Sequence, residues 1–256
     1  MKVCVLSSGS KGNSTLVTTD EVKILIDLGT TSTYIENTLK NMNINPKDIS
    51  GILVTHTHVD HIKGLRVFIK RYNPIIYVTE ELLNQLQEEI GTFRYKLYED
   101  KKILIGNLNV NIIKTSHDAK GSIGFIISSE SSSLVYITDT GYINKKYFDV
   151  LKNNNLYIIE SNHDIKMLMD GPYPYYLQQR VRGDKGHLSN KQVSDYLVKF
   201  IGKNTKKIVF AHISEKNNSE EKVLETFKEV MDENNIDFND IIIARQNEAT
   251  EVIEVW

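Results

Sequence analysis

Short apolar runs alternate with amphipathic stretches along most of the chain. The apolar runs predict strands at residues 3–6, 14–18, 23–26, 52–54, 75–78, 103–105, 108–114, 123–128, 133–138, 156–159 and 207–211, with two more near 241–243 and 251–255. Helical spacing covers residues 31–41, 62–72, 80–89, 145–153, 190–200 and 219–233, and an irregular stretch precedes residue 190. Strand-rich halves with interspersed helices predict an α/β fold of two mixed sheets covered by helices. With no linker, repeat or low-complexity segment, we expect one domain over residues 1–256.

Length and composition narrow the class of protein. A chain of 256 residues is long enough for one α/β domain with a sizeable core. The single cysteine, Cys4, excludes an internal disulfide framework and a cysteine-based zinc site. No apolar run approaches a membrane span, and the first strand is too short for a signal sequence, so we expect a cytoplasmic protein without a membrane partner. A formal net charge of −2 means that any nucleic-acid contact must come from a local patch or from bound metal.

One motif concentrates metal-binding side chains. His56, His58, Asp60 and His61 place three imidazoles and one carboxylate within six positions. Imidazole and carboxylate are the side chains that hold borderline and hard divalent cations. The motif lies between the strand at 52–54 and the following helix, at the carboxyl end of a strand, where open α/β sheets place their sites. The alternative is a solvated, histidine-rich turn.

Further candidate ligands follow other predicted strands. His117, Asp139 and His212 each come shortly after a strand, and Asp27 closes the strand at 23–26. Taken singly, each has a plain structural alternative, because an aspartate at a strand end can cap a turn and a histidine can be a satisfied core residue. Taken together, they put polar ligands at one edge of the sheets, beside the first motif.

The order of these residues resembles the metallo-β-lactamase superfamily over nearly the whole chain. The resemblance implies an αβ/βα sandwich with two divalent metal ions at one edge. His56, His58 and His117 would hold one ion; Asp60, His61 and His212 would hold the second; Asp139 would bridge both. Asp27 would orient ligands from outside the metal sphere. Two such ions lower the pKa of a shared water and clamp a phosphoryl oxygen.

Two more residues resemble the ribonuclease Z and nuclease branches of that family. Glu160 ends the strand after the one that leads to Asp139, and His187 follows in the sequence Gly-His-Leu-Ser. The resemblance implies that His187 acts near the scissile phosphate and that Glu160 orients it, with His187 as the candidate for protonating the leaving oxygen. Residues 189–192 have the pattern of a capping box that opens a helix. The alternative is that His187 only packs against that helix start.

Closer similarity is to the YycJ/WalJ group, bacterial single-domain members linked to exonuclease action on DNA. It is carried by the Ser/Gly-rich loop at 7–14, by residues 161–164 and 171–174, and by 180–183. The loop could present Ser10, Lys11 and Asn13 to a phosphate, or be only a hairpin loop. Arg180, Arg182 and Lys185 could line a groove for a nucleic-acid backbone, or be a solvated basic face. His163 is a possible further substrate contact, or a hydrogen-bonding group within its loop.

The sequence thus favours a dinuclear metallohydrolase that cleaves phosphodiesters, most simply a 5′-to-3′ exonuclease with DNA as its partner. A ribonuclease, a cyclic phosphodiesterase, and a lactone or thioester hydrolase are the alternatives within the same fold. A redox diiron protein of this fold usually has a glutamate where this chain has His58, and a non-catalytic metal-binding module is a further reading. Histidine and aspartate ligands suit zinc, manganese or iron, and the residues leave the choice of metal and the oligomeric state open.

Overall fold

The computed structural model describes residues 1–255. The strands of the first sheet are β1 Lys2–Ser7, β2 Ser14–Thr18, β3 Lys23–Ile26, β4 Gly51–Leu53, β5 Ile75–Val78, β6 Tyr95–Leu97 and β14 Ile253–Glu254. Those of the second are β7 Lys102–Ile105, β8 Leu108–Lys114, β9 Ile123–Ser128, β10 Ser133–Ile137, β11 Leu156–Glu160, β12 Lys207–Ala211 and β13 Ile241–Ile243. The strand orders are β14-β1-β2-β3-β4-β5-β6 and β13-β12-β11-β10-β9-β8-β7.

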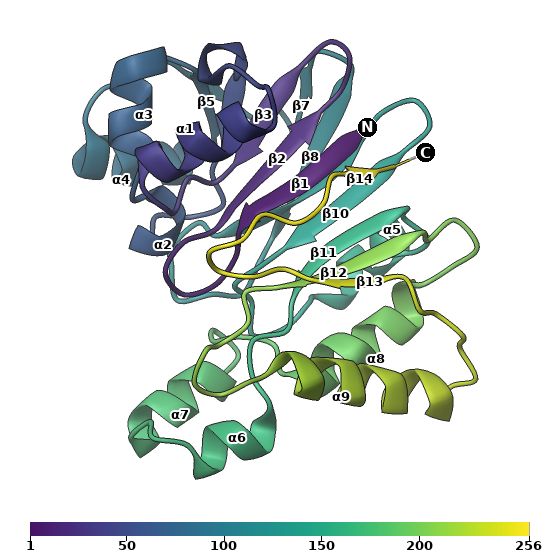
Figure 1. Ribbon diagram of the computed structural model, residues 1–256. Helices are drawn as coiled ribbons and strands as arrows, with labels where there is room; N and C mark the ends of the chain where they lie inside the picture. Colours follow the sequence, from purple (N-terminus) through teal and green to yellow (C-terminus); the bar gives the residue numbers. More distant parts are fainter. Residues whose placement is uncertain (256) are drawn as a thin grey trace.

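Helices cover the outer faces of both sheets (Figure 1). The helices are α1 Ser32–Asn41, α2 Val59–Ile62, α3 Leu65–Tyr72, α4 Glu80–Ile90, α5 Phe148–Leu151, α6 Ile165–Asp170, α7 Tyr175–Arg182, α8 Asn190–Phe200 and α9 Glu220–Glu233, with 3₁₀ turns η1 Pro46–Asp48 and η2 Lys145–Tyr147. Helices α1, α3 and α4 lie on the first sheet, and α8 and α9 lie on the second (Figure 1). The expected αβ/βα sandwich is therefore confirmed. The expectation of one domain over 1–256 stays a prediction, and Trp256 lies outside the described residues.

The central strands are apolar on both faces because both faces are covered. In β10, Leu134 and Tyr136 join the larger core cluster, which includes residues of both sheets. Val135 and Ile137 alternate with them and join a second cluster with residues of α8 and α9. Such strands read as continuous apolar runs rather than as alternating ones. Of the helices in residues 1–255, none is long and apolar enough to cross a membrane.

Strand direction brings several strand ends to one edge of the molecule. Strands β3, β4 and β5 run parallel to one another, as do β10, β11 and β12. Strand β8 is antiparallel to β9, which is antiparallel to β10, so β8 and β10 point the same way. The segments that follow these strands are therefore gathered at the edge where open α/β sheets bind their ligands.

The structure departs from the sequence-based elements at several places. The helix expected at 62–72 is two helices, α2 and α3, because Gly64 separates them; a Cβ there would lie 2.4 Å from the Thr30 carbonyl oxygen. The stretch at 145–153 is η2 followed by the short α5, and the strand expected near 251–255 is only the two residues of β14. The stretch before residue 190 contains α6 and α7, and β6 was not expected at all.

Candidate metal centre

Three of the side chains that the sequence predicts as site residues stand at the carboxyl ends of strands, at the same edge of the molecule. Asp27 directly follows β3, Asp139 comes two residues after β10, and His212 directly follows β12. All three have left-handed backbones, with φ of 58°, 54° and 51°. This conformation is uncommon outside glycine, although aspartate and histidine adopt it more readily than most residues, and it clusters at functional sites. At each of the three positions, this conformation turns the backbone sharply out of the strand and directs the side chain toward the shared edge.

A tight local packing holds the histidine motif. His58 occupies the N-cap position of α2 without a side-chain capping bond, and Asp60 and His61 lie in the single turn of that helix. The backbone N–H of Asn13 donates to the Asp60 carbonyl over 2.8 Å, and the Asn13 amide lies 3.2 Å from His61 Nε2. A Cβ on Gly29 would lie 1.7 Å from the Asp60 carbonyl oxygen, so only glycine fits there. The loop between β1 and β2, through Asn13, therefore holds Asp60 and His61 in place.

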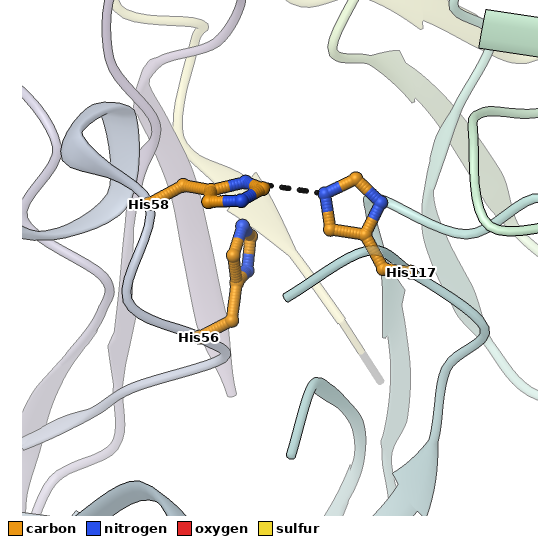
Figure 2. A group of neighbouring side chains, drawn as sticks. All are labelled: His56, His58 and His117. Carbon is orange, nitrogen blue, oxygen red and sulfur yellow. Dashed lines mark hydrogen bonds between the residues drawn. The ribbon is translucent and has the colours of Figure 1, made fainter. Parts of the chain in front are cut away.

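The first group of candidate ligands is a histidine triad (Figure 2). The ligand atoms of His56, His58 and His117 all lie within 4.8 Å of one another. His58 Nδ1 and His117 Nε2 are 3.2 Å apart, and the two rings point toward each other (Figure 2). His56 Nε2 is buried without a hydrogen-bond partner. Burial lowers the pKa of His56 well below its ordinary value, which favours the neutral ring. Its Nδ1 lies 3.0 Å from the Thr55 hydroxyl, which donates its own proton to Asp27, so Nδ1 carries the ring proton and Nε2 the lone pair. An unpaired, buried nitrogen is costly unless a cation takes its lone pair.

A second group lies beside the first. The ligand atoms of Asp60, His61 and His212 also lie within 4.8 Å of one another. His212 Nε2 is 3.5 Å from Asp60 Oδ2, and His61 Nε2 is 3.7 Å from the same oxygen. Two imidazoles and one carboxylate form a donor set that suits zinc, manganese or iron.

Asp139 lies between the two groups. Its Oδ2 is 3.1 Å from His61 Nε2, and its Oδ1 is 3.5 Å from His212 Nδ1 and 3.9 Å from His117 Nε2. Oδ2 is buried and accepts no hydrogen bond, although His61 Nε2 is so near. The other nitrogen of His61, Nδ1, lies 2.7 Å from Asp27 Oδ2. A buried carboxylate oxygen and an imidazole nitrogen this close need a cation between them, which a proton on Nε2 or a metal ion supplies.

Asp27 is the support behind this arrangement. Its Oδ1 accepts a hydrogen bond from the backbone N–H of Thr55 over 2.8 Å, and its Oδ2 accepts one from the Thr55 hydroxyl over 2.7 Å. Oδ2 also lies 2.7 Å from His61 Nδ1. Burial raises the pKa of Asp27, and the contacts with His61 and Thr55 act against that rise. A metal-binding histidine is commonly held in this way by a carboxylate on its other nitrogen.

The buried carboxylates of the centre shift the pKa values of the histidines beside them. Burial opposes charge on His61, yet Asp139 and Asp27 outweigh it and hold the pKa of His61 well above its usual range. Burial also opposes charge on His212, but Asp139 and Asp60 raise its pKa to about 10. Burial likewise opposes ionisation of Asp139, but His212 and His61 hold its pKa well below the usual range. Buried carboxylates this close together require cations, which protons or metal ions supply.

Glu160 and His187 form a pair at the same centre. Glu160 Oε2 lies 3.1 Å from His187 Nδ1, while Oε1 accepts the backbone N–H groups of Thr140 and Leu188 over 2.6 and 3.3 Å. Burial opposes ionisation of Glu160, but its contact with His187 lowers its pKa. The expected capping box at the start of α8 is confirmed, with both reciprocal bonds between Ser189 and Gln192. His187 thus sits between a fixed helix start and a fixed carboxylate, and it lines the cavity of the metal centre.

The expected substrate contacts divide into accessible and buried groups. Ser10 and Arg180 line the cavity. Lys11 is exposed and bound to Glu215 over 2.6 Å, so its charge is already paired. Asn13 and His163 are each only 1% exposed, which does not fit the direct substrate contact expected from the sequence. Asn13 instead positions the histidine motif. Burial lowers the pKa of His163 to about 4, so it is a neutral group inside its loop.

The basic residues of α7 differ in their surroundings. Arg180 Nη2 and Nε lie 2.6 and 2.7 Å from Asp118 Oδ2. Arg182 points instead to α6, with Nη1 3.1 Å from the Met169 sulfur, whereas Lys185 lines the cavity. Asp118 was missed by the sequence reasoning, although its position directly after His117 was a signal. Its other oxygen lies 3.4 Å from His117 Nε2, so it links α7 to the first histidine group.

Comparison with known proteins agrees with the geometry. A model of the metallo-beta-lactamase superfamily matches residues 8–212. The chain is 36% identical to exodeoxyribonuclease YycJ of Bacillus anthracis over 90% of this chain and 88% of that protein. It is 33% identical to exodeoxyribonuclease WalJ of Streptococcus pneumoniae over 86% of this chain and 84% of that protein.

A solved structure supports the same fold. The metallo-beta-lactamase fold protein YhfI from Bacillus subtilis superposes with a TM-score of 0.75 at 16% identity, covering 98% of this chain and 99% of that one. At this identity the likeness concerns the fold alone. The match of the superfamily model over most of the chain, and the identity to YycJ and WalJ, place the sequence within one family. The chain belongs to the metallo-beta-lactamase superfamily.

Proposed function

We propose that the protein is a dinuclear metal-dependent phosphodiesterase that degrades DNA from a 5′ end. One observation carries the proposal: Asp139 lies between two three-residue ligand groups, and the Glu160–His187 pair borders the same cavity. Two relatives named exodeoxyribonucleases, at 36% and 33% identity over most of the chain, support DNA as the substrate.

The proposed ligand set follows the geometry. His56, His58 and His117 hold one divalent ion, and Asp60, His61 and His212 hold the other, with Asp139 shared. The buried, unpartnered atoms His56 Nε2 and Asp139 Oδ2 support this assignment. Two divalent ions, when bound, supply a nucleophilic water at neutral pH and neutralise charge on the phosphoryl oxygens. Zinc, manganese and iron all fit this donor set.

The chain's own residues complete the reaction. Glu160 engages Nδ1 of His187 and leaves Nε2 of that ring as the nitrogen that gives a proton to the leaving oxygen. Glu160 Oε1 is held by two backbone N–H groups, so the carboxylate keeps the imidazole in one orientation. Lys185, which lines the cavity, adds a positive charge for the phosphates of the bound strand, whereas the charge of Arg180 is paired with Asp118.

End-blocked substrates test this function. We expect linear duplex DNA with a 3′-terminal phosphorothioate block to be degraded, and the same duplex blocked at its 5′ ends to resist. Closed circular DNA should also resist, because an exonuclease needs an end. Preference for RNA of the same sequence, for a cyclic nucleotide or for a lactone would contradict the proposed DNA specificity and support one of those substrates instead.

Replacement of Asp27 by asparagine is expected to reduce turnover by about 10- to 100-fold, the usual cost of losing an outer partner of a metal ligand. The amide of asparagine cannot accept from both Thr55 and His61 as the carboxylate does. His61 would lose its fixed orientation and one metal would bind more weakly. Steady-state rates at increasing metal concentration measure this, with the exposed Asp48→Asn as control. Unchanged metal affinity and rate would show that Asp27 does not orient His61.

A further inference from the structure

Two tyrosines on α7 are unusually open to solvent. Tyr175 and Tyr176 are 72% and 73% exposed, more than any other large apolar side chain in residues 1–255. Helices α6 and α7 extend beyond the sheets, apart from the helices that cover them (Figure 1). Two adjacent exposed aromatic rings, on a helix of which other residues line the cavity of the metal centre, are a surface that a planar ligand can cover.

Helix geometry separates the directions of these two rings. Leu177, Arg180 and Val181 of α7 line the cavity. Successive residues of an α-helix turn by about 100°, so Tyr176 lies about 40° from Arg180, about 100° from Leu177 and about 140° from Val181. Tyr175 lies about 140° from Arg180, about 160° from Leu177 and about 120° from Val181, so Tyr176 is the nearer of the two to the cavity side of the helix. The two tyrosines therefore have equal exposure but different access to the site.

Arg180 fixes the position of Tyr176 relative to the metal centre. Its guanidinium lies 2.6 Å from Asp118 Oδ2, and Asp118 Oδ1 lies 3.5 Å from His58 Nε2. Residues one turn apart on a helix have Cβ atoms about 5–6 Å apart. That separation is the distance to Arg180, and the Arg180 side chain, Asp118 and His58 follow one another from there to the metal centre. A strand whose phosphate is at the metal centre would therefore bring a base a few nucleotides away to the ring of Tyr176.

Charge on the same wall suits a nucleic-acid backbone. Arg182 and Lys185 are exposed on or just after α7. Lys216 Nζ lies 5.8 Å from the ring centre of Tyr173, which also lines the cavity. Aromatic rings beside positive charges are the usual means of holding a single strand without sequence preference. Bases inside a duplex are already stacked on their neighbours, so the rim fits unpaired bases.

We propose that Tyr176 is a stacking platform for an unpaired base a few nucleotides from the scissile phosphate, so that the enzyme takes a single-stranded end into its cavity. This inference rests on the proposed function, because it requires a nucleic-acid substrate at the metal centre. It concerns how the strand is held, and it does not depend on which metal is bound.

A double-mutant cycle between the ring and the base tests the inference. Two oligonucleotide duplexes are compared: one with a short unpaired 5′ end, and one with abasic residues in that end. Tyr176→Ala should raise KM on the first by about fivefold or more, since stacking of one base on an aromatic ring is worth about 1–3 kcal/mol. On the abasic substrate, the same variant and the wild type should differ by less than about twofold.

Two further variants sharpen the result. Tyr176→Phe keeps the ring and should restore most of the affinity. Tyr175→Ala, equal in exposure and on the same helix, should behave as the wild type. Equal effects of Tyr175→Ala and Tyr176→Ala, or an equal loss on intact and abasic ends, would overturn the inference. Failure of the wild type to cut either oligonucleotide would instead refute the proposed function, and the inference with it.

Discussion

Replacement of Asp139 by asparagine is expected to abolish hydrolysis and to lower the metal content of the protein. Among residues 1–255, Asp139 is the one carboxylate within 4 Å of all three of His61, His117 and His212, so both proposed ions depend on it. Asparagine keeps the size of the side chain and tolerates the left-handed φ of 54°, so the fold should persist. The loss should exceed the about 10- to 100-fold typical of outer partners, and rate assays with elemental analysis measure it.

Two comparisons make this result specific. His58→Ala removes a ligand of only one proposed ion and should lower the metal content by less than the Asp139 substitution does. The exposed Asp20→Asn should leave both rate and metal content unchanged. If the Asp139 variant kept both metals and full activity, Asp139 would not be the shared ligand.

His187→Ala is expected to keep its metals and its fold but to lose about 10²- to 10⁴-fold in rate on DNA, the usual cost of removing a positioned acid. The alkoxide leaving oxygen of DNA needs a proton, whereas the p-nitrophenolate leaving group scarcely does. The loss on bis-p-nitrophenyl phosphate should therefore be much smaller. Rates on both substrates, with metal content measured alongside, give the comparison.

Glu160→Gln serves as the companion to that variant. Glutamine can still accept from the Thr140 and Leu188 backbones, but it carries no charge to stabilise the protonated His187. Its losses should follow the same substrate order as those of His187→Ala, at a smaller magnitude. Equal losses on both substrates in both variants would assign His187 to phosphate binding or to structure, and not to proton transfer.

Much of the centre could be predicted because its residues follow strands. Asp27, His117, Asp139 and His212 come directly or within a few residues after apolar runs, and parallel strands end at one edge. The chain itself thus indicates which polar groups meet. The backbone conformation at three of these positions could not be foreseen, because a positive φ outside glycine is imposed by the surrounding fold.

The roles of the surrounding polar residues were less predictable. Asn13 and His163 have the residue types of substrate contacts, but tertiary packing buries both. Asp118 stands directly after His117, but its partner Arg180 is 62 residues away in the sequence, so local patterns do not show the pairing. Helix α7 was missed because its only buried residue is the polar Gln178, so it lacks an apolar face of helical period. Pairings of this kind depend on the three-dimensional arrangement, which local patterns do not contain.

Metal stoichiometry tests the central claim most directly. Seven ligands, with Asp139 shared, suffice for two ions, so protein purified without chelator should approach two metal equivalents per chain by elemental analysis. Removal of the metal should abolish phosphodiester hydrolysis, and Zn²⁺, Mn²⁺ or Fe²⁺ should restore it together with the two equivalents. A metal content that stays near zero after reconstitution with all three ions, or full activity of the metal-free protein, would contradict the account.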